Sequence, residues 1–118
     1  MIKLKDILLE NKLKKLKYFR DNKSLKKAFT YAVRYKKEDA FYGELIELVK
    51  KSKFFPNASD NQILLHAKIE FSKAFPIARK HISKKYKQGK EIFPNFWGHY
   101  KYWPEYFKEF VNVMEMFK

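Results

Sequence analysis

Residues 59–88, SDNQILLHAKIEFSKAFPIARKHISKKYKQ, decide the fold that the sequence predicts. Ser59 can cap a helix and Gln62 can reach back to it, which is the spacing of a capping box. Behind this start, apolar residues recur at steps of three, four and seven and therefore share one helix face. These residues are Leu64, Phe71, Phe75, Ala78 and Ile82.

Pro76 falls inside this helical pattern. A proline removes one backbone donor, clashes with the preceding turn and disfavours helical geometry at Phe75. The stretch therefore either kinks at Pro76 or splits into two helices, the second opened by Pro76. Because the apolar period continues across the proline, we predict a kink. Gly89 suits the left-handed cap that ends the helix.

The chain before residue 59 also carries helical periods, without the alternation typical of strands. Residues 2–19 are predicted to form a basic helix whose narrow apolar stripe docks on the domain. A second helix, capped by Asp21 or Ser24, ends near residue 35. Residues 36–39 are either a short turn or the exposed face of a continuing helix. A third helical segment follows, which Pro56 closes and which is marked by Phe41, Leu45, Leu48 and Val49. The stripe consists of Ile2, Leu9, Leu13 and Leu16, and the second helix is marked by Leu25, Ala28, Phe29, Ala32 and Tyr35.

One more helix is expected at the C-terminus. Pro104 suits its first position and Glu105 its first turn. Residues 90–103 carry turn residues and no helical period. The sequence thus predicts an all-α, single-domain bundle of about five helices over residues 1–118, with an irregular aromatic-rich segment before the last helix. Residues 1–20 can form a peripheral helix of that domain.

Composition narrows the class of protein. The 118 residues match one domain, and 46% hydrophobic and 19% aromatic residues argue against a disordered chain. Cysteine is absent, so disulfides and Cys-based metal sites are not expected. No apolar run approaches the roughly 18 residues of a membrane span, and charges interrupt the N-terminal segment too often for a signal peptide. We therefore expect a cytoplasmic protein without a membrane partner.

The charge balance predicts a polyanionic partner. Lys and Arg number 27 against 13 Asp and Glu, which gives a net charge of +14. Arginine occurs only at Arg20, Arg34 and Arg79, and lysine is a point charge suited to phosphate rather than to base edges. This favours contact with nucleic-acid backbone, with little reading of sequence. A lysine-rich composition that serves only solubility, or an acidic protein partner, would give the same balance.

Two groups of residues are candidate contacts. Opposite the apolar face of residues 59–88, a cationic ridge would extend over roughly 20 Å of helix. The ridge consists of Lys73, Lys80, Lys84 and Lys87. Within residues 93–107, exposed aromatic rings could stack on bases or form a partner interface, whereas buried rings would fill the core. The candidate rings are Trp97, Tyr100, Tyr102 and Trp103.

Catalytic and metal-binding patterns are not found in the sequence. His66 and Glu70 lie one helical turn apart, but no third ligand accompanies them. His81 lies among cations and suits a phosphate contact better than a base. The chain has no glycine-rich phosphate loop and no nucleophile motif. We expect a non-enzyme without a cofactor, a metal or a small-molecule substrate.

Three segments carry a resemblance to a known family: FYGELIEL (41–48), LLHAKIEFSKAFPIAR (64–79) and YFKEFVNVMEMF (106–117). Their order and separations are similar to those of the small helical subunit of type III CRISPR effector complexes. By resemblance, the central basic positions are Lys68 and Arg79, and the closing positions are Phe110, Glu115 and Phe117. The resemblance implies a non-catalytic subunit that stacks in copies and lines the path of guide and target RNA.

Together these interpretations give one expected function and one alternative. We expect a basic helical protein that binds nucleic-acid backbone, single-stranded RNA above all, beside other protein subunits of an antiviral ribonucleoprotein. The alternative is a protein-interaction module, such as a phage or accessory factor, that binds an acidic partner surface. A duplex-DNA reader is less favoured because no tight helix-turn-helix turn is evident.

Overall fold

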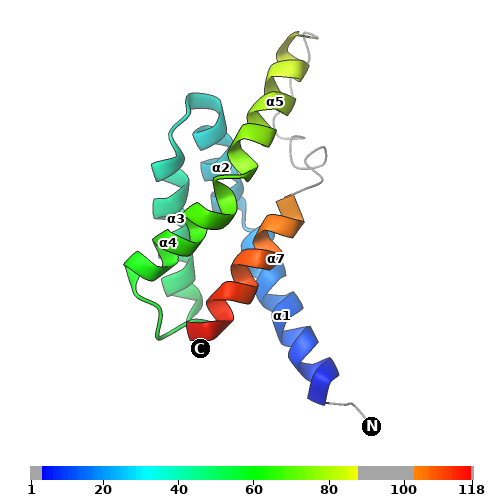
Figure 1. The fold of residues 1–118 in the computed structure, drawn as a ribbon, viewed down its shortest axis with the longest axis vertical. Coiled ribbons are helices and arrows are strands. Elements are labelled where there is room, and N and C mark those ends of the chain that lie inside the picture. The colour runs from blue at the N-terminus through cyan, green and yellow to red at the C-terminus, as the bar shows by residue number, and fades with distance from the viewer. Residues whose placement is uncertain (1–3, 88–102, 118) are drawn as a thin grey trace.

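The computed structural model describes the backbone of residues 4–87 and 103–117 and the side chains of residues 10–81 and 103–117. This part of the chain is all-α, as predicted, and contains six α-helices where about five were expected (Figure 1). The elements are α1 (Leu4–Arg20), α2 (Lys23–Tyr35), α3 (Glu38–Ser52), α4 (Asp60–Phe71), α5 (Ala74–Lys87), α7 (Trp103–Met114) and the short 3₁₀ helix η1 (Glu115–Phe117).

The additional helix arises because residues 59–88 split into α4 and α5. The predicted capping box opens α4, since the Gln62 backbone N–H donates to the Ser59 hydroxyl at 3.2 Å and the Ser59 N–H donates to the Gln62 side chain at 2.8 Å. The break lies between Phe71 and Ala74, so the predicted kink is wrong. Pro76 is the third residue of α5, where a backbone N–H has no intrahelical partner in any helix. The proline therefore costs α5 no hydrogen bond.

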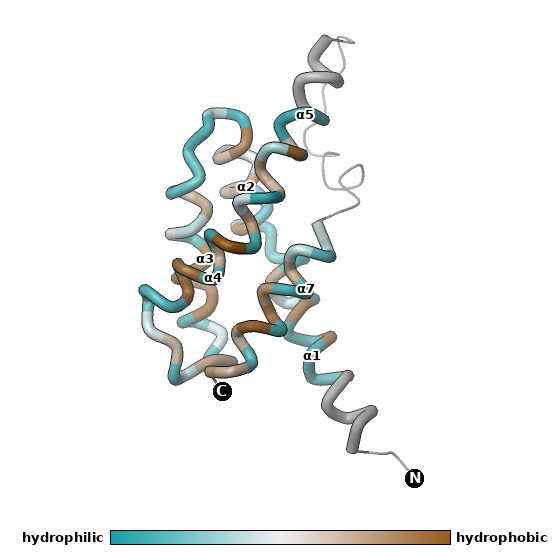
Figure 2. The backbone as a smooth tube through the Cα atoms, viewed as in Figure 1, coloured by the Kyte–Doolittle hydropathy of each residue, from teal (hydrophilic) through white to brown (hydrophobic). Residues whose placement is uncertain are grey.

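Aromatic rings from all six described α-helices fill the core. Phe29 stacks on Phe75 at 4.9 Å between ring centroids, and the Trp103 ring lies 4.1 Å from that of Phe29. Phe71 meets Phe107 edge-on at 4.9 Å. Figure 2 shows hydrophobic positions where the helices face one another and hydrophilic positions along the α2–α3 turn. Burying large rings supplies most of the apolar area that holds such a small bundle together.

The helix α1 packs along α7, and its first part extends beyond the rest of the body (Figure 1). Phe19 is its fully buried residue among those whose side chains are described, and Leu16 packs partly against the core. Leu13, predicted to dock, is instead 53% exposed, and the side chains of Ile2 and Leu9 lie outside the described part. Of the two predicted stripe residues that are described, Leu16 therefore docks and Leu13 does not.

Several helix ends differ from the prediction by a few residues. The cap of α2 is Asn22, not Asp21 or Ser24, because its side-chain oxygen accepts from the Leu25 N–H at 3.0 Å. The helix α7 begins at Trp103, so Pro104 takes its second position. Residues 90–102 of the predicted irregular segment lie outside the described part of the chain.

Candidate nucleic-acid interface

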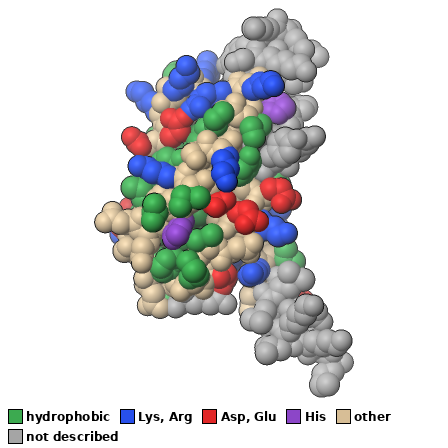
Figure 3. Space-filling view, viewed as in Figure 1, with side chains coloured by type: hydrophobic (Ala, Val, Ile, Leu, Met, Phe, Trp, Pro, Cys, Tyr) green, Lys and Arg blue, Asp and Glu red, His purple; other side chains and the backbone are tan. Residues whose placement is uncertain are grey.

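The fold brings two strongly basic segments together. Residues 22–37, which contain α2, carry six cationic side chains and no acidic one, and α5 likewise carries only cationic charges. These two helices pack against each other. Figure 3 shows a group of Lys and Arg side chains at the upper end of the molecule, where the α2–α3 turn and α5 lie. We call this surface the basic end and define it by Tyr31, Arg34, Tyr35, Lys36, Lys37 and Lys80.

Two exposed tyrosines lie within the basic end. Tyr31 and Tyr35 are one helical turn apart on α2 and are 44% and 53% exposed. Their ring centroids are 4.9 Å apart with an interplanar angle of 51°. The Arg34 guanidinium lies 5.5 Å from the centre of the Tyr35 ring. This arrangement leaves ring surface accessible beside cationic groups, as base-stacking surfaces require.

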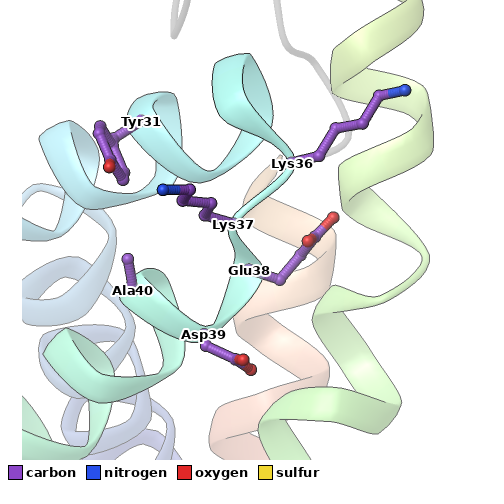
Figure 4. A pocket seen from close by; sticks show the side chains of 6 residues that line it. All are labelled: Tyr31, Lys36, Lys37, Glu38, Asp39 and Ala40. Carbon is purple, nitrogen blue, oxygen red and sulfur yellow. The ribbon is translucent and has the colours of Figure 1, made fainter.

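A surface depression of about 360 Å³ lies at the α2–α3 turn (Figure 4). Figure 4 shows Lys37 pointing back toward Tyr31, whereas Lys36 points to the other side of the turn, toward α5. The two lysines thus spread positive charge to both sides of the turn. Adjacent phosphates of one strand could contact these two ammonium groups separately.

Lys36 adopts an uncommon backbone conformation. Its φ of 55° and ψ of 41° are left-handed, the conformation for which glycine is usual at a helix C-cap. A lysine there costs conformational energy that a glycine would not. Lys53 at the end of α3 is also left-handed, with φ 59°. The left-handed conformation alone therefore does not identify a functional residue. Lys36 and Lys53 do form a matched pair of positions for substitution by glycine.

Two carboxylates also line the depression, both from the first turn of α3. Glu38 forms an ion pair with Arg79 of α5, which offsets its charge. Asp39, together with burial as the larger cause, raises the pKa of Tyr42 to about 12. Both acids also suit the positive end of the α3 dipole. Glu38 and Asp39 are therefore acidic neighbours of the basic end, and only the charge of Glu38 is offset by an ion pair.

The predicted ridge does not form as one row, because the helix breaks beside its first member. Lys73 is exposed in the break and Lys80 is exposed on α5, while the side chains of Lys84 and Lys87 lie outside the described part. Lys68 is exposed on α4. Arg79 is only 26% exposed and is engaged with Glu38, so it positions α5 instead of presenting a cation to solvent. Among the predicted cationic contacts whose side chains are described, only Lys80 belongs to the basic end.

The predicted aromatic contacts separate in a similar way. Trp103 is 3% exposed and lies in the core, 4.4 Å from the Phe107 ring. This outcome matches the alternative in which large rings fill the core. Trp97, Tyr100 and Tyr102 lie outside the described residues. The exposed pair on α2 was missed because Tyr35 was assigned to the buried face, although the charged run Arg34–Lys37 marks that helix end as solvent-facing.

The closing positions of the family resemblance have structural roles. Phe110 is fully buried and Phe117 packs on the core, where its ring lies 5.7 Å from that of His66. Glu115 forms an ion pair with Lys15 at 2.8 Å. Within the described side chains, no group of three His, Asp or Glu residues could hold a metal ion. Among the helices that the structure describes, none combines the length and apolarity needed to cross a membrane.

Comparisons of this chain with protein-family models, with curated proteins and with solved structures find no match. The similarity to the small subunit of type III CRISPR effector complexes therefore stays a prediction from residues 41–117. The function is inferred from the basic end itself.

Proposed function

We propose that the protein binds the phosphate backbone of single-stranded nucleic acid at the basic end, with single-stranded RNA as its ligand. The observation that carries the proposal is the exposed Tyr31–Tyr35 pair, which lies beside the cationic side chains Arg34 and Lys37 at the end of α2 and the α2–α3 turn (Figure 4). Neither exposed rings nor lysines alone would favour this ligand over other anions. Their combination matches the two features of a single strand, charged phosphates and accessible base faces.

The cationic groups would supply affinity without base recognition. Lys36, Lys37 and Lys80 are exposed point charges, which suit phosphate oxygens. Such contacts release bound counterions, so their contribution falls as salt rises. The one exposed arginine of the basic end, Arg34, stacks near Tyr35. We therefore expect the affinity to fall steeply as salt rises and to depend little on base sequence.

The tyrosines would favour a single strand over a duplex. Bases within a duplex already stack on their neighbours, whereas unpaired bases can stack on side-chain rings. One base–aromatic contact contributes roughly 1–3 kcal/mol. Tyr31 and Tyr35 lie one helical turn apart, so they could contact neighbouring bases of one strand.

The proposal describes a binding subunit without catalysis. No cofactor, metal or small-molecule substrate enters it. By the family resemblance, the assembly would be a cytoplasmic type III CRISPR ribonucleoprotein in which other protein subunits accompany the RNA. That part of the proposal depends on the resemblance and not on the basic end.

The test is a fluorescence-anisotropy titration of single-stranded RNA and duplex DNA at about 50 and about 200 mM salt. Each neutralised phosphate contributes roughly −0.7 to the log–log salt slope on a single strand, so the slope counts contacts. We expect micromolar or tighter binding that favours single-stranded RNA, with a slope worth about three phosphates. Equal and weak binding of both polymers would overturn the proposal, because the charge would then act only generically.

A further inference from the structure

A second surface, remote in sequence from the basic end, lies between α1 and α7. It is an apolar groove of about 70 Å³, which we call the α1–α7 groove. Its residues are Lys12, Leu13, Leu16, Lys108, Val111 and Asn112. Leu13, Leu16 and Val111 supply apolar surface, and the two lysines come from opposite helices.

The walls of the groove are fixed by contacts below it. Phe19 anchors the end of α1 in the core, with its ring centroid 6.3 Å from that of Phe110 on α7. Lys15 and Glu115 form an ion pair at 2.8 Å, and both side chains are only 12% exposed. Since partly buried ion pairs are screened less than exposed ones, this contact ties α1 to η1, directly after the end of α7. A ligand would therefore meet a preformed groove.

Leu13 gives the groove an unfilled apolar rim. The side chain is 53% exposed, although its neighbours Leu16 and Val111 are packed or buried. Covering a leucine of this kind with another apolar side chain is favourable in proportion to the area removed from water. One apolar residue of a partner could lie over Leu13 and reach into the groove.

The charges around the groove specify the chemistry of that partner. Lys12 and Lys108 flank the apolar residues, and the further lysines of α1 at positions 14 and 17 are exposed. Glu115, the carboxylate joining α1 to η1, is paired with Lys15. A second copy of this chain would bring another +14 charge to a cationic surface, which opposes association. The phosphates of a nucleic acid would pair with the lysines, but RNA has no aliphatic side chain that could cover Leu13.

We propose that the α1–α7 groove binds an acidic amphipathic helix of a partner protein. Leucine-like residues of that helix would contact Leu13, Leu16 and Val111, and its carboxylates would meet Lys12 and Lys108. This is the helix-in-groove mode, in which apolar anchors at helical spacing give affinity and flanking charges give orientation. Glu105 and Glu109, exposed carboxylates that flank Lys108 in the sequence of α7, would repel an acidic helix laid over them and so restrict its placement.

The probe is a designed peptide of about 15 residues with Leu at helical spacing and Glu at the other positions. A scrambled peptide of the same composition is the control for generic attraction to a basic protein. Each peptide is titrated into the full-length, ¹⁵N-labelled protein, and amide shifts are followed by NMR. We expect saturable shifts at Leu13, Leu16, Lys108 and Val111 with the amphipathic peptide only.

Variants separate this groove from other apolar surfaces. Leu13→Ser should weaken peptide binding roughly tenfold. Leu65→Ser on α4 is the matched control, because Leu65 is 55% exposed, and it should leave binding unchanged. The double variant Lys12→Glu, Lys108→Glu should no longer bind the acidic peptide and should instead bind a peptide in which Lys replaces Glu. Far-UV circular dichroism checks that each variant keeps its helices.

Three results of the peptide titrations would overturn the proposal. They are shifts centred on α4 or on the basic end, equal binding of the scrambled peptide, and no saturation up to about 1 mM peptide. Displacement of the peptide by single-stranded RNA would instead assign the groove to nucleic acid and would also overturn it. The basic end lies on other helices, so Leu13→Ser should leave RNA affinity unchanged, and the RNA titration tests the proposed function separately.

Discussion

Arg79 of α5 forms an ion pair with Glu38, the first residue of α3. The two side chains are 26% and 28% exposed, and the guanidinium also lies 5.9 Å from the centre of the Phe75 ring. The contact fixes α5 beside the α2–α3 turn, on the side toward which Lys36 points (Figure 4). An arginine that sequence reasoning assigned to phosphate binding thereby contributes to the same site indirectly.

The ion pair predicts a measurable coupling between two helices. Arg79→Met and Glu38→Gln should each lower the free energy of unfolding by about 0.5–1 kcal/mol, since the pair is partly exposed and screened. The loss of unfolding free energy in the double variant should be smaller, by about 0.5 kcal/mol, than the sum of the losses in the two single variants. Urea unfolding of the four proteins measures this cycle. Lys80→Met, the adjacent exposed cation, is the control and should leave stability unchanged; additive losses at Arg79 and Glu38 would contradict the structural role.

Replacing the exposed rings should reduce affinity only where bases are present. Tyr31→Leu and Tyr35→Leu keep apolar surface but remove the stacking face, and each should weaken single-stranded RNA binding by roughly 1–2 kcal/mol. The same substitutions should have no effect on an abasic strand of equal length and charge, as measured by anisotropy. Tyr→Phe at either position should bind like the parent. A loss of equal size on both strands would show that the rings support the fold or the lysines instead of contacting bases.

The same substitution to glycine can be made at Lys36, inside the basic end, and at Lys53, outside it. Both residues are left-handed, so Lys36→Gly and Lys53→Gly should each raise the free energy of unfolding by about 0.5 kcal/mol. Only Lys36→Gly should weaken RNA binding, with a salt slope smaller by about 0.7. Urea unfolding and anisotropy give the two quantities. If Lys36→Gly stabilises the protein and leaves RNA affinity intact, Lys36 does not contact phosphate.

Tyr42 should make stability fall at high pH. Burial, and secondarily the charge of Asp39, raises the pKa of the Tyr42 phenol to about 12 from 10.0. The unfolded chain therefore loses this proton first, and the stability due to the neutral phenol is present below pH 10 and is lost between pH 10 and about 12. Urea midpoints of Tyr42→Phe should fall less steeply over that interval than those of the parent. Deprotonation of lysines is common to both proteins and cancels; parallel curves would contradict the raised pKa.

Much of the fold was predictable because local signals agreed with packing. Ser59 and Gln62 form the predicted capping box, and Phe71, Phe75 and Ala78 are buried as their spacing indicated. The kink predicted at Pro76 was wrong because the apolar period continues across two separate helices. Periodicity alone cannot distinguish a kink from a nearby break. The break became evident only from the backbone between Phe71 and Ala74.

The candidate site was less predictable because it depends on contacts between distant segments. Nothing in the sequence near Lys80 indicates that α5 packs on α2, and the Glu38–Arg79 pair joins residues from separate helices. Trp103 and Tyr35 illustrate the same difficulty, since their chemical types gave no sign that the first is buried and the second exposed. The net charge predicted a cationic surface; only the packing indicates where that surface concentrates.

The most direct test of the basic end compares two single charge reversals, Lys37→Glu and Lys51→Glu. Both lysines are exposed, but Lys51 lies near the opposite end of α3, about 20 Å along the helix from the α2–α3 turn. Single-stranded RNA affinity is measured by anisotropy at about 50 and about 200 mM salt. Lys37→Glu should weaken binding roughly tenfold and reduce the salt slope by at least about 0.7, whereas Lys51→Glu should remain close to the parent. Equal losses in the two variants would contradict a localised site and would leave only a generic attraction between RNA and a basic protein.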